Sequence, residues 1–214
     1  MTTMLLSVLF TAPASAGGIG ILATAGAHTE QLYFYSQTDA DGNAFPTLDD
    51  YQQFRINETL PNFGAGFELL LGDRDDKIVG NCRFYWVMDT PQQGPAGGET
   101  YTPTRGGAAR VVAPDDLVVA LRDTPRHVGL GMVGLSWGFI GNPDGLMLSA
   151  MGHVGAAFVT ADHTEFLAVD IGPSLSYRAA RQVQLFGDVQ YMLRYRKSFG
   201  HSANVLVGAR YLFD

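Results

Sequence analysis

The C-terminal stretch decides the fold: VQLFGDVQYMLRYR at residues 183–196, KSFGHS at 197–202 and ANVLVGARYLFD at 203–214. From Val183 onward every second residue of the first segment is apolar or Gly, and the positions between include Asp188 and Arg194. A period of two places successive side chains on opposite faces of a β-strand. The last segment repeats the pattern, and the short Gly-containing connection predicts an antiparallel hairpin with one apolar and one polar face.

The same alternation recurs upstream in six further segments, at residues 17–35, 63–71, 77–89, 127–140, 146–159 and 165–177. The chain is therefore predicted to be all-β, with eight antiparallel strands. The connections after the second, fourth and sixth strands are tight, whereas those after the first and third are long, at about 31–60 and 90–126. Long loops on one side and short turns on the other are typical of an up-and-down transmembrane β-barrel with external loops and periplasmic turns.

Inside the first long connection, Thr47-Leu48-Asp49-Asp50 resembles a capping box, which predicts a short helix over residues 51–56. The second connection contains DDLVVALRD, a candidate helix or extra strand.

Composition narrows the class of protein further. The 26 glycines exceed the usual share, and many lie inside predicted strands, where a barrel needs close strand approach. The formal charge of −7 argues against a nucleic-acid partner, which would require a basic face. One cysteine, Cys82, excludes an internal disulfide. No apolar run reaches the length of a transmembrane helix.

The first sixteen residues, MTTMLLSVLFTAPASA, read as a secretory signal peptide. An apolar run precedes Ala14-Ser15-Ala16, a small-x-small signature for cleavage after Ala16, although the positive charge expected at the start is missing. Export from the cytoplasm is therefore predicted, with residues 17–214 forming the barrel domain.

The contents of the two faces indicate which one looks outward. On the apolar face, aromatic residues fall near both ends of the strands, and Val, Leu, Ile, Ala and Gly lie between them. One predicted belt holds Trp137, Phe139, Tyr177, Tyr211 and Phe213, and the other holds Phe63, Trp86, Phe158 and Tyr195. Two aromatic belts around an aliphatic band match the two interfaces of a membrane. A membrane barrel is favoured over a soluble ligand-binding barrel.

The opposite face carries charges of both signs, which would then lie in the lumen. The predicted lumen charge network consists of Glu68, Arg83, Asp170, Asp188, Arg194 and Arg210. The expected register places Arg210 beside Asp188 and Glu68 beside Arg83. Eight strands leave an interior just wide enough for side chains, so this network is predicted to fill the lumen and hold the barrel together rather than to conduct.

The alternation, the long loops on one side and the ending ANVLVGARYLFD resemble the small outer-membrane β-barrels of Gram-negative bacteria, of the OmpA transmembrane-domain and OmpX kind. The resemblance covers the mature chain and implies location in the outer membrane and insertion by the barrel-assembly machinery. Tyr211 and Phe213 match the aromatic end of that family's last strand, although Asp214 follows them.

Two kinds of chemical site remain as hypotheses. Asp39, Asp41, Asn43 and Asp50 have the spacing of a calcium-binding loop, but Ala44 replaces the glycine of the sharp turn, and an ordinary turn is the favoured alternative. Catalysis on lipid would need a positioned His and Ser. His201-Ser202 and His163-Thr164-Glu165 are the candidates, and polar loop residues are the favoured interpretation because neighbouring strand residues point to opposite sides.

The sequence thus predicts an integral outer-membrane protein with a structural or interaction role, surrounded by outer-membrane lipids and lipopolysaccharide. A partner outside the cell would bind through the long loops, and no cofactor is expected beyond calcium in the first loop. A narrow channel and a lipid-modifying enzyme remain the alternatives.

Overall fold

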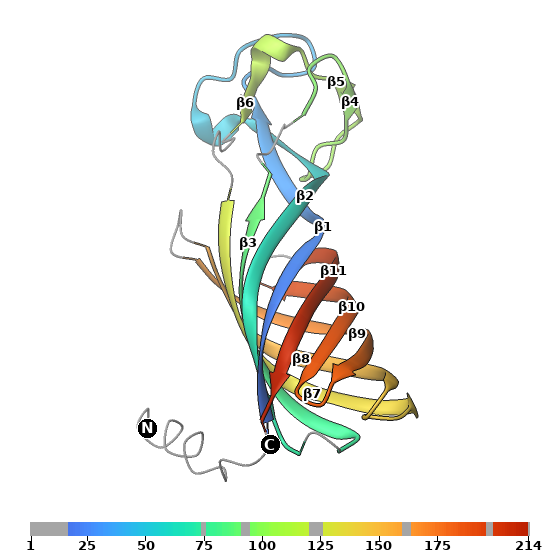
Figure 1. The fold of residues 1–214 in the computed structure, drawn as a ribbon. Helices are drawn as coiled ribbons and strands as arrows, with labels where there is room; N and C mark the ends of the chain where they lie inside the picture. Colours follow the sequence, from blue (N-terminus) through green and yellow to red (C-terminus); the bar gives the residue numbers. More distant parts are fainter. Residues whose placement is uncertain are drawn as a thin grey trace.

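The structure is a computed structural model that describes residues 17–73, 76–90, 95–119, 126–159, 164–195 and 199–213. Eight strands form one closed antiparallel barrel (Figure 1). In barrel order they are β1 (Gly17–Ser36), β2 (Gln52–Leu71), β3 (Ile78–Asp89), β7 (Arg126–Gly141), β8 (Leu146–Val159), β9 (Thr164–Ala180), β10 (Val183–Tyr195) and β11 (Phe199–Leu212). Each strand pairs with the next, and β11 pairs with β1 to close the sheet. The predicted eight-stranded up-and-down barrel is confirmed.

Three short strands lie in the second long connection: β4 (Thr100–Tyr101), β5 (Arg110–Val111) and β6 (Leu117–Val119). β4 pairs with β5, and β6 pairs with the far end of β1. A 3-10 helix, η2 (Pro114–Asp116), accompanies them, and another, η1 (Leu48–Asp50), lies in the first long connection. None of the helices in the described ranges is long and apolar enough to cross a membrane. The predicted signal peptide, residues 1–16, lies outside the described residues.

The short connections, the start of β1 and the end of β11 all lie at the same rim of the barrel (Figure 1). β7 and β8 are joined through residues 142–145, and β9 and β10 through residues 181–182. Gly141 begins the first of these turns with a φ of 101°, a conformation that favours glycine. At the same side Phe213 N donates to Gly17 O at 2.8 Å, which fastens the end of the last strand to the start of the first.

The first long connection is shorter than predicted, because β1 continues to Ser36 and β2 begins at Gln52. The helix expected at residues 51–56 is wrong: η1 occupies only Leu48–Asp50, and the following residues pair with β1 as strand. Phe54 explains this outcome. Its side chain is fully buried against Phe34, its register partner on β1, and a strand places both rings on the same face.

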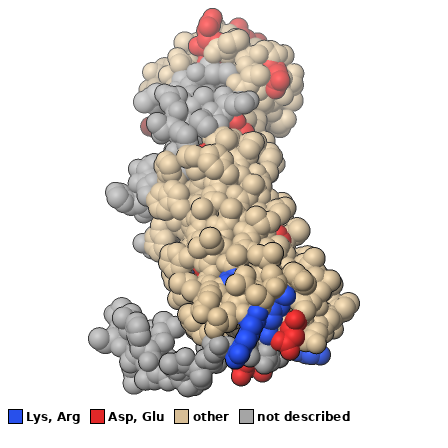
Figure 2. All heavy atoms as spheres, in the orientation of Figure 1, with Lys and Arg blue, Asp and Glu red and all other residues tan. Residues whose placement is uncertain are grey.

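The two faces of the barrel have opposite character. The predicted belt residues are exposed, from 42% for Phe213 to 57% for Trp137, and aliphatic side chains such as Ile21 and Val205 are exposed between the belts. The lumen side chains Glu68, Arg83 and Asp188 are almost fully buried. Charged side chains are largely absent from the visible face of the barrel and gather at its two ends (Figure 2). A barrel that presents its apolar face outward stands in a bilayer.

Glycines on the inward face make room for large lumen side chains. A Cβ on Gly134 would lie 2.5 Å from the ring of His153, and one on Gly208 would lie 2.5 Å from the ring of Phe186. Such distances are below van der Waals contact, so these two glycines allow the neighbouring strand to place a bulky side chain in the lumen. The high glycine content thus serves the filling of the barrel as well as its curvature.

Candidate functional site

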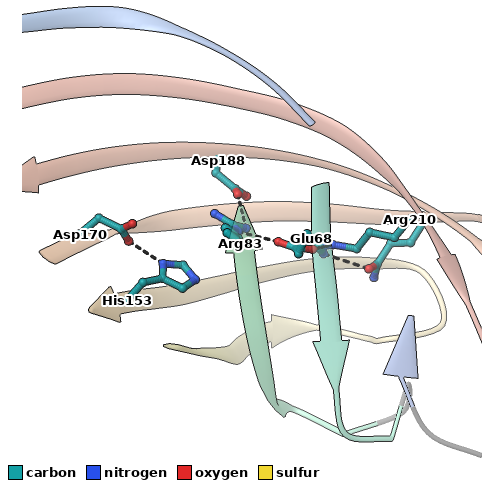
Figure 3. A network of polar contacts seen from close by, with 7 residues as sticks. Glu68, Arg83, His153, Asp170, Asp188 and Arg210 are labelled. Carbon is teal, nitrogen blue, oxygen red and sulfur yellow. Dashed lines mark hydrogen bonds and ion pairs between the residues drawn. The ribbon is translucent and has the colours of Figure 1, made fainter. Parts of the chain in front are cut away.

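An ion-pair network crosses the lumen (Figure 3). Arg83 on β3 donates from Nε to Glu68 Oε2 at 2.6 Å and from Nη2 to Asp188 Oδ2 at 2.6 Å, and all three side chains are shielded from solvent. Glu68 lies beside Arg83 in register, as predicted, whereas Asp188 comes from β10 on the far wall. One guanidinium therefore ties together two opposite sides of the barrel.

Arg210 on β11 completes this network. It donates from Nε to Glu68 Oε1, from Nη2 to Glu68 Oε2 at 3.2 Å and from Nη1 to Gln184 Oε1 at 3.1 Å. Its guanidinium carbon also lies 3.9 Å from the centre of the Phe186 ring, a cation–π contact. Glu68 thus accepts hydrogen bonds from two arginines, the arrangement that a buried carboxylate needs to remain charged.

The expected pairing of Arg210 with Asp188 is wrong. Arg210 lies opposite Gln184, and Asp188 lies opposite Leu206. The reason is the start of β11 at Phe199, because residues 199–202 belong to the strand rather than to the loop. This lengthening moves the pairing of the hairpin by four residues.

Two further polar pairs lie deeper toward the long-loop side. His153 Nδ1 and Asp170 Oδ1 are 2.5 Å apart, and Arg194 Nη1 lies 3.4 Å from Asp89 Oδ2. All six predicted network residues therefore line the lumen, but they form three separate groups: Glu68 with Arg83, Asp188 and Arg210, then Asp170 with His153, then Arg194 with Asp89. The sequence alone did not reveal the partners His153 and Asp89.

Several buried polar atoms in the described part of the lumen lack a hydrogen-bond partner. They include both amide atoms of Asn62, Asn81 and Gln190 and the hydroxyl of Tyr85. Buried polar groups normally find a partner in protein or in ordered water. Tyr85 also belongs to a buried apolar cluster with Met132, Met192 and Leu206, so the lumen interior is partly polar and partly apolar.

A small hollow opens at the short-turn end of the lumen. Four serines from β7, β8 and β9 line it, together with Gln184 and Arg210. The serines are Ser136, Ser149, Ser174 and Ser176. Because Arg210 also binds Glu68, the ion-pair network borders this hollow on its inner side.

As expected for neighbours in a strand, His201 and Ser202 point to opposite faces of the barrel. His201 Nδ1 and the Tyr191 hydroxyl form a hydrogen bond at 2.5 Å on the outer face, whereas Ser202 points into the lumen and is 3.0 Å from His28 Nδ1. Both His28 and Ser202 are buried. His163 lies outside the described residues. The His28–Ser202 pair escaped sequence reasoning because its members lie on the first and last strands.

The predicted calcium loop is an ordered turn. Asp39 Oδ1 accepts hydrogen bonds from the backbone N–H groups of Asp41 and Asn43, both at 2.9 Å, and the Asn43 side chain donates to the same carboxylate. These bonds lower the pKa of Asp39, with the Asn43 side chain as the main cause. Asp50 Oδ2 instead accepts from the Thr47 hydroxyl at 2.8 Å. In the part of the chain that the structure describes, no three His, Cys, Asp or Glu residues are placed to hold a metal. Calcium binding stays a prediction.

The outward face changes character part-way along the first two strands. On β1 it reads Ile19, Ile21, Ala23, Ala25, Ala27 and then Thr29, Gln31, Tyr33, Tyr35. On β2 it reads Leu71, Leu69, Phe67, Ala65, Phe63, Pro61 and then Thr59, Asn57, Arg55, Gln53. Thr29 and Thr59 are register partners, and their hydroxyls are 2.8 Å apart. The switch at this pair marks the outer boundary of the apolar belt, about eleven residues from Gly17, as expected for a tilted membrane strand.

Beyond that boundary, residues 29–36 of β1 and 52–59 of β2 form a two-stranded stalk (Figure 1). Its inner face carries an aromatic cluster, and Ser36 and Glu58 lie on the same face. Phe34 and Phe54 stack with their ring centres 5.3 Å apart, and Tyr101 meets Phe34 edge-on at 4.9 Å. Val112 is fully buried in the same cluster. The second long connection therefore packs against the stalk and covers its inner face.

Residues 37–51 and 95–119 together form a head on the stalk (Figure 1). Arg110 holds its parts together, with Nε donating to Gln52 Oε1 at 2.7 Å and Nη2 donating to Thr38 O at 2.5 Å. Thr38 also donates its hydroxyl to Asp116 Oδ2 at 3.0 Å. Burial in this cluster raises the pKa of Tyr101. The head is thus a packed unit in which the two long connections contact each other.

The head is acidic. Its two segments contain two arginines, Arg105 and Arg110, and seven acidic residues. The acidic residues are Asp39, Asp41, Asp49, Asp50, Glu99, Asp115 and Asp116. Acidic side chains are visible on the head in Figure 2, and basic ones gather at the opposite end of the barrel. An approaching partner would therefore meet a negative surface.

No protein-family model matches the chain, and no curated protein matches its sequence. Among solved structures it is similar to Ail, the attachment invasion locus protein of Yersinia pestis, at 8% identity over 93% of this chain and 99% of that one, with a TM-score of 0.42. Ail in complex with the heparin analogue sucrose octasulfate is similar at 11% identity over 92% and 99% of the two chains, with a TM-score of 0.35. The beta domain of the Bordetella autotransporter BrkA gives 12% identity, the same coverage and a TM-score of 0.31.

Proposed function

We propose that this chain is an integral protein of the outer membrane of a Gram-negative bacterium, of the small-barrel kind, and that it acts as an interaction protein through its external head. The lumen network has a structural role in this proposal. The observation that supports it best is the stalk: two strands continue past the apolar belt and carry a packed head away from the membrane. Loops on a rigid scaffold are the usual place for binding residues.

The lumen chemistry favours a closed barrel over a channel. Eight strands enclose little space, and here Arg83 bridges it from Glu68 to Asp188. Discrete conductance steps from the purified wild-type protein in planar bilayers would contradict the closed lumen.

Location and role are tested separately. The native chain should fractionate with the outer membrane and migrate differently on SDS gels before and after boiling, as folded barrels do. A protein that stays soluble and migrates identically in both states would refute the membrane assignment. On intact cells, added protease should cleave within the head, which lies outside in this proposal.

The interaction role is tested with a barrel whose head is replaced by short Gly-Asn turns at residues 37–51 and 95–119. Because the head is acidic, cells with the native chain should adhere to a cationic protein surface more than cells with the headless barrel, and added salt should weaken the difference. Equal adhesion at equal surface expression would refute the role of the head.

A lipid-modifying enzyme is the second candidate, and the hydrogen bond between His28 and Ser202 is the observation that favours it. A His within hydrogen-bond reach of a Ser is the minimum for a serine nucleophile. Burial of both side chains argues for a structural pair instead. Labelling of the native chain by a fluorophosphonate probe, lost in Ser202→Ala, would support the enzyme, and absence of labelling would reject it.

A further inference from the structure

The outward face of the stalk has an unusual composition for an exposed sheet. Its residues, called the stalk face below, are Thr29, Gln31, Tyr33, Tyr35, Gln53, Arg55, Asn57 and Thr59. The face holds two tyrosines, three amides and one arginine, and it contains no acidic residue although the head beyond it is acidic. Tyr33 and Tyr35 are 40% and 37% exposed although they lie beyond the lipid-facing belt.

Packing within the chain explains the inner face of the stalk, whereas on this face the second connection contacts Gln53, whose Oε1 accepts from the Thr104 hydroxyl at 3.0 Å. The inner face is covered by Val112 and Tyr101 from the second connection. On the stalk face the polar groups are held in place by their neighbours: Tyr33 donates its hydroxyl to Gln31 Oε1 at 3.3 Å, and Gln53 Nε2 donates to the Tyr35 hydroxyl at 3.0 Å. Arg55 lies across from Tyr33 in register and is exposed. The face therefore presents aromatic rings flanked by fixed amides and a cation.

The stalk face is continuous with the lipid-facing belt. It lies on the same side of the same two strands, and it begins at the Thr29–Thr59 pair where the belt ends. At a rise of about 3.3 Å per residue, Tyr33 and Tyr35 lie roughly 13 to 20 Å along the strand beyond that boundary. In an outer membrane this is the layer that holds the sugars of the lipopolysaccharide molecules whose acyl chains pack against the belt.

We propose that the stalk face binds the core oligosaccharide of the lipopolysaccharide that surrounds the barrel. Tyrosine rings stack on the C–H faces of sugars, and amide groups bind sugar hydroxyls. The guanidinium of Arg55 binds the phosphates and carboxylates that such oligosaccharides carry. An acid-free face suits this anionic ligand, whereas the head does not. The inference rests on the proposed outer-membrane location and identifies a second partner surface besides the head.

The test compares the native chain, folded in phospholipid nanodiscs, with a triple variant, Tyr33→Thr, Tyr35→Thr and Arg55→Thr. Threonine retains the strand preference at these exposed positions, so the barrel should still fold. A matched control carries Tyr51→Thr and Arg105→Thr on the head. The probe is the phosphorylated core oligosaccharide released from rough-type lipopolysaccharide, titrated by calorimetry, with its dephosphorylated form as a second arm.

The native chain and the control should bind the phosphorylated core equally. The triple variant should bind it at least about tenfold more weakly, since it removes together three side chains of the types that dominate binding hot spots. Dephosphorylation should weaken binding to the native chain but change little for the triple variant, which lacks Arg55. Equal affinity of the native chain and the triple variant, or no binding by either, would overturn the inference.

Failure of this inference can be told apart from failure of the proposed function. Each protein is first checked for a heat-dependent gel shift and for outer-membrane fractionation. If the native chain passes both checks but does not bind the oligosaccharide, only the role of the stalk face is refuted. If it fails both checks, the membrane assignment itself is refuted.

Discussion

Replacing Arg83 should destabilise the barrel more than replacing either Glu68 or Arg210. Arg83→Met takes away the hydrogen bond to Asp188 Oδ2, and Asp188 Oδ1 already has no partner among the described residues. Glu68 keeps Arg210. One buried carboxylate is thus left without a partner. Breaking a buried ion pair in this way costs about 3–5 kcal/mol, and we expect about 5 for Arg83→Met.

The other two substitutions should cost less, for reasons that the structure supplies. After Glu68→Gln, Arg83 retains Asp188 and Arg210 retains Gln184, so we expect about 4 kcal/mol. After Arg210→Met, Glu68 retains Arg83, and the site borders the hollow where water can replace the lost guanidinium, so we expect about 3 kcal/mol.

The measurement is the free energy of unfolding in urea, in detergent micelles, followed by tryptophan fluorescence and by the gel shift of the folded barrel. Asp49→Asn, on the exposed surface of the head, is the control and should lie within about 0.5 kcal/mol of the native chain. The reasoning is refuted if Arg83→Met costs least of the three, or if all three substitutions match the control.

Three further outcomes are expected. Ala23→Arg should destabilise the barrel by about 2–4 kcal/mol and reduce its insertion into vesicles. Gln31→Arg, on the same face of the same strand but beyond the boundary of the belt, should cost at most about 1 kcal/mol. Equal costs would contradict the position of that boundary. Val112→Ala should loosen the head by about 2 kcal/mol, seen as faster proteolysis within residues 95–119, while the same change at its exposed neighbour Val111 should not; equal rates would contradict the packed head. The pKa of Asp39 is lowered by the side-chain amide four residues further on, so the order of its turn should be complete above the ordinary carboxyl pKa and be lost as pH falls through the lowered value; an NMR titration checks this, and shifts in this turn on adding calcium would support the calcium hypothesis.

The sequence alone determined the strands, their number and the character of each face. These properties depend on a period of two that is local in the sequence, so Tyr211 or Val205 can be assigned to the lipid side without knowledge of the tertiary structure. The alternation of long loops and short turns then predicts which rim of the barrel faces the outside of the cell. The same period continues through residues 52–60, so the beginning of β2 is also readable, but the apolar side chains lie on the inner face there and the polar composition is typical of a loop.

The pairing of the charges was decided by the tertiary structure. Arg210 reaches Glu68 across 142 residues of sequence, and His28 reaches Ser202 across 174. Such contacts exist only after the last strand closes on the first, with a register that a few residues of loop length can shift. The stalk likewise needs the second connection to fold back on Phe34 and Phe54. Local periodicity fixes which way a side chain points, whereas closure of the barrel fixes which side chain it meets.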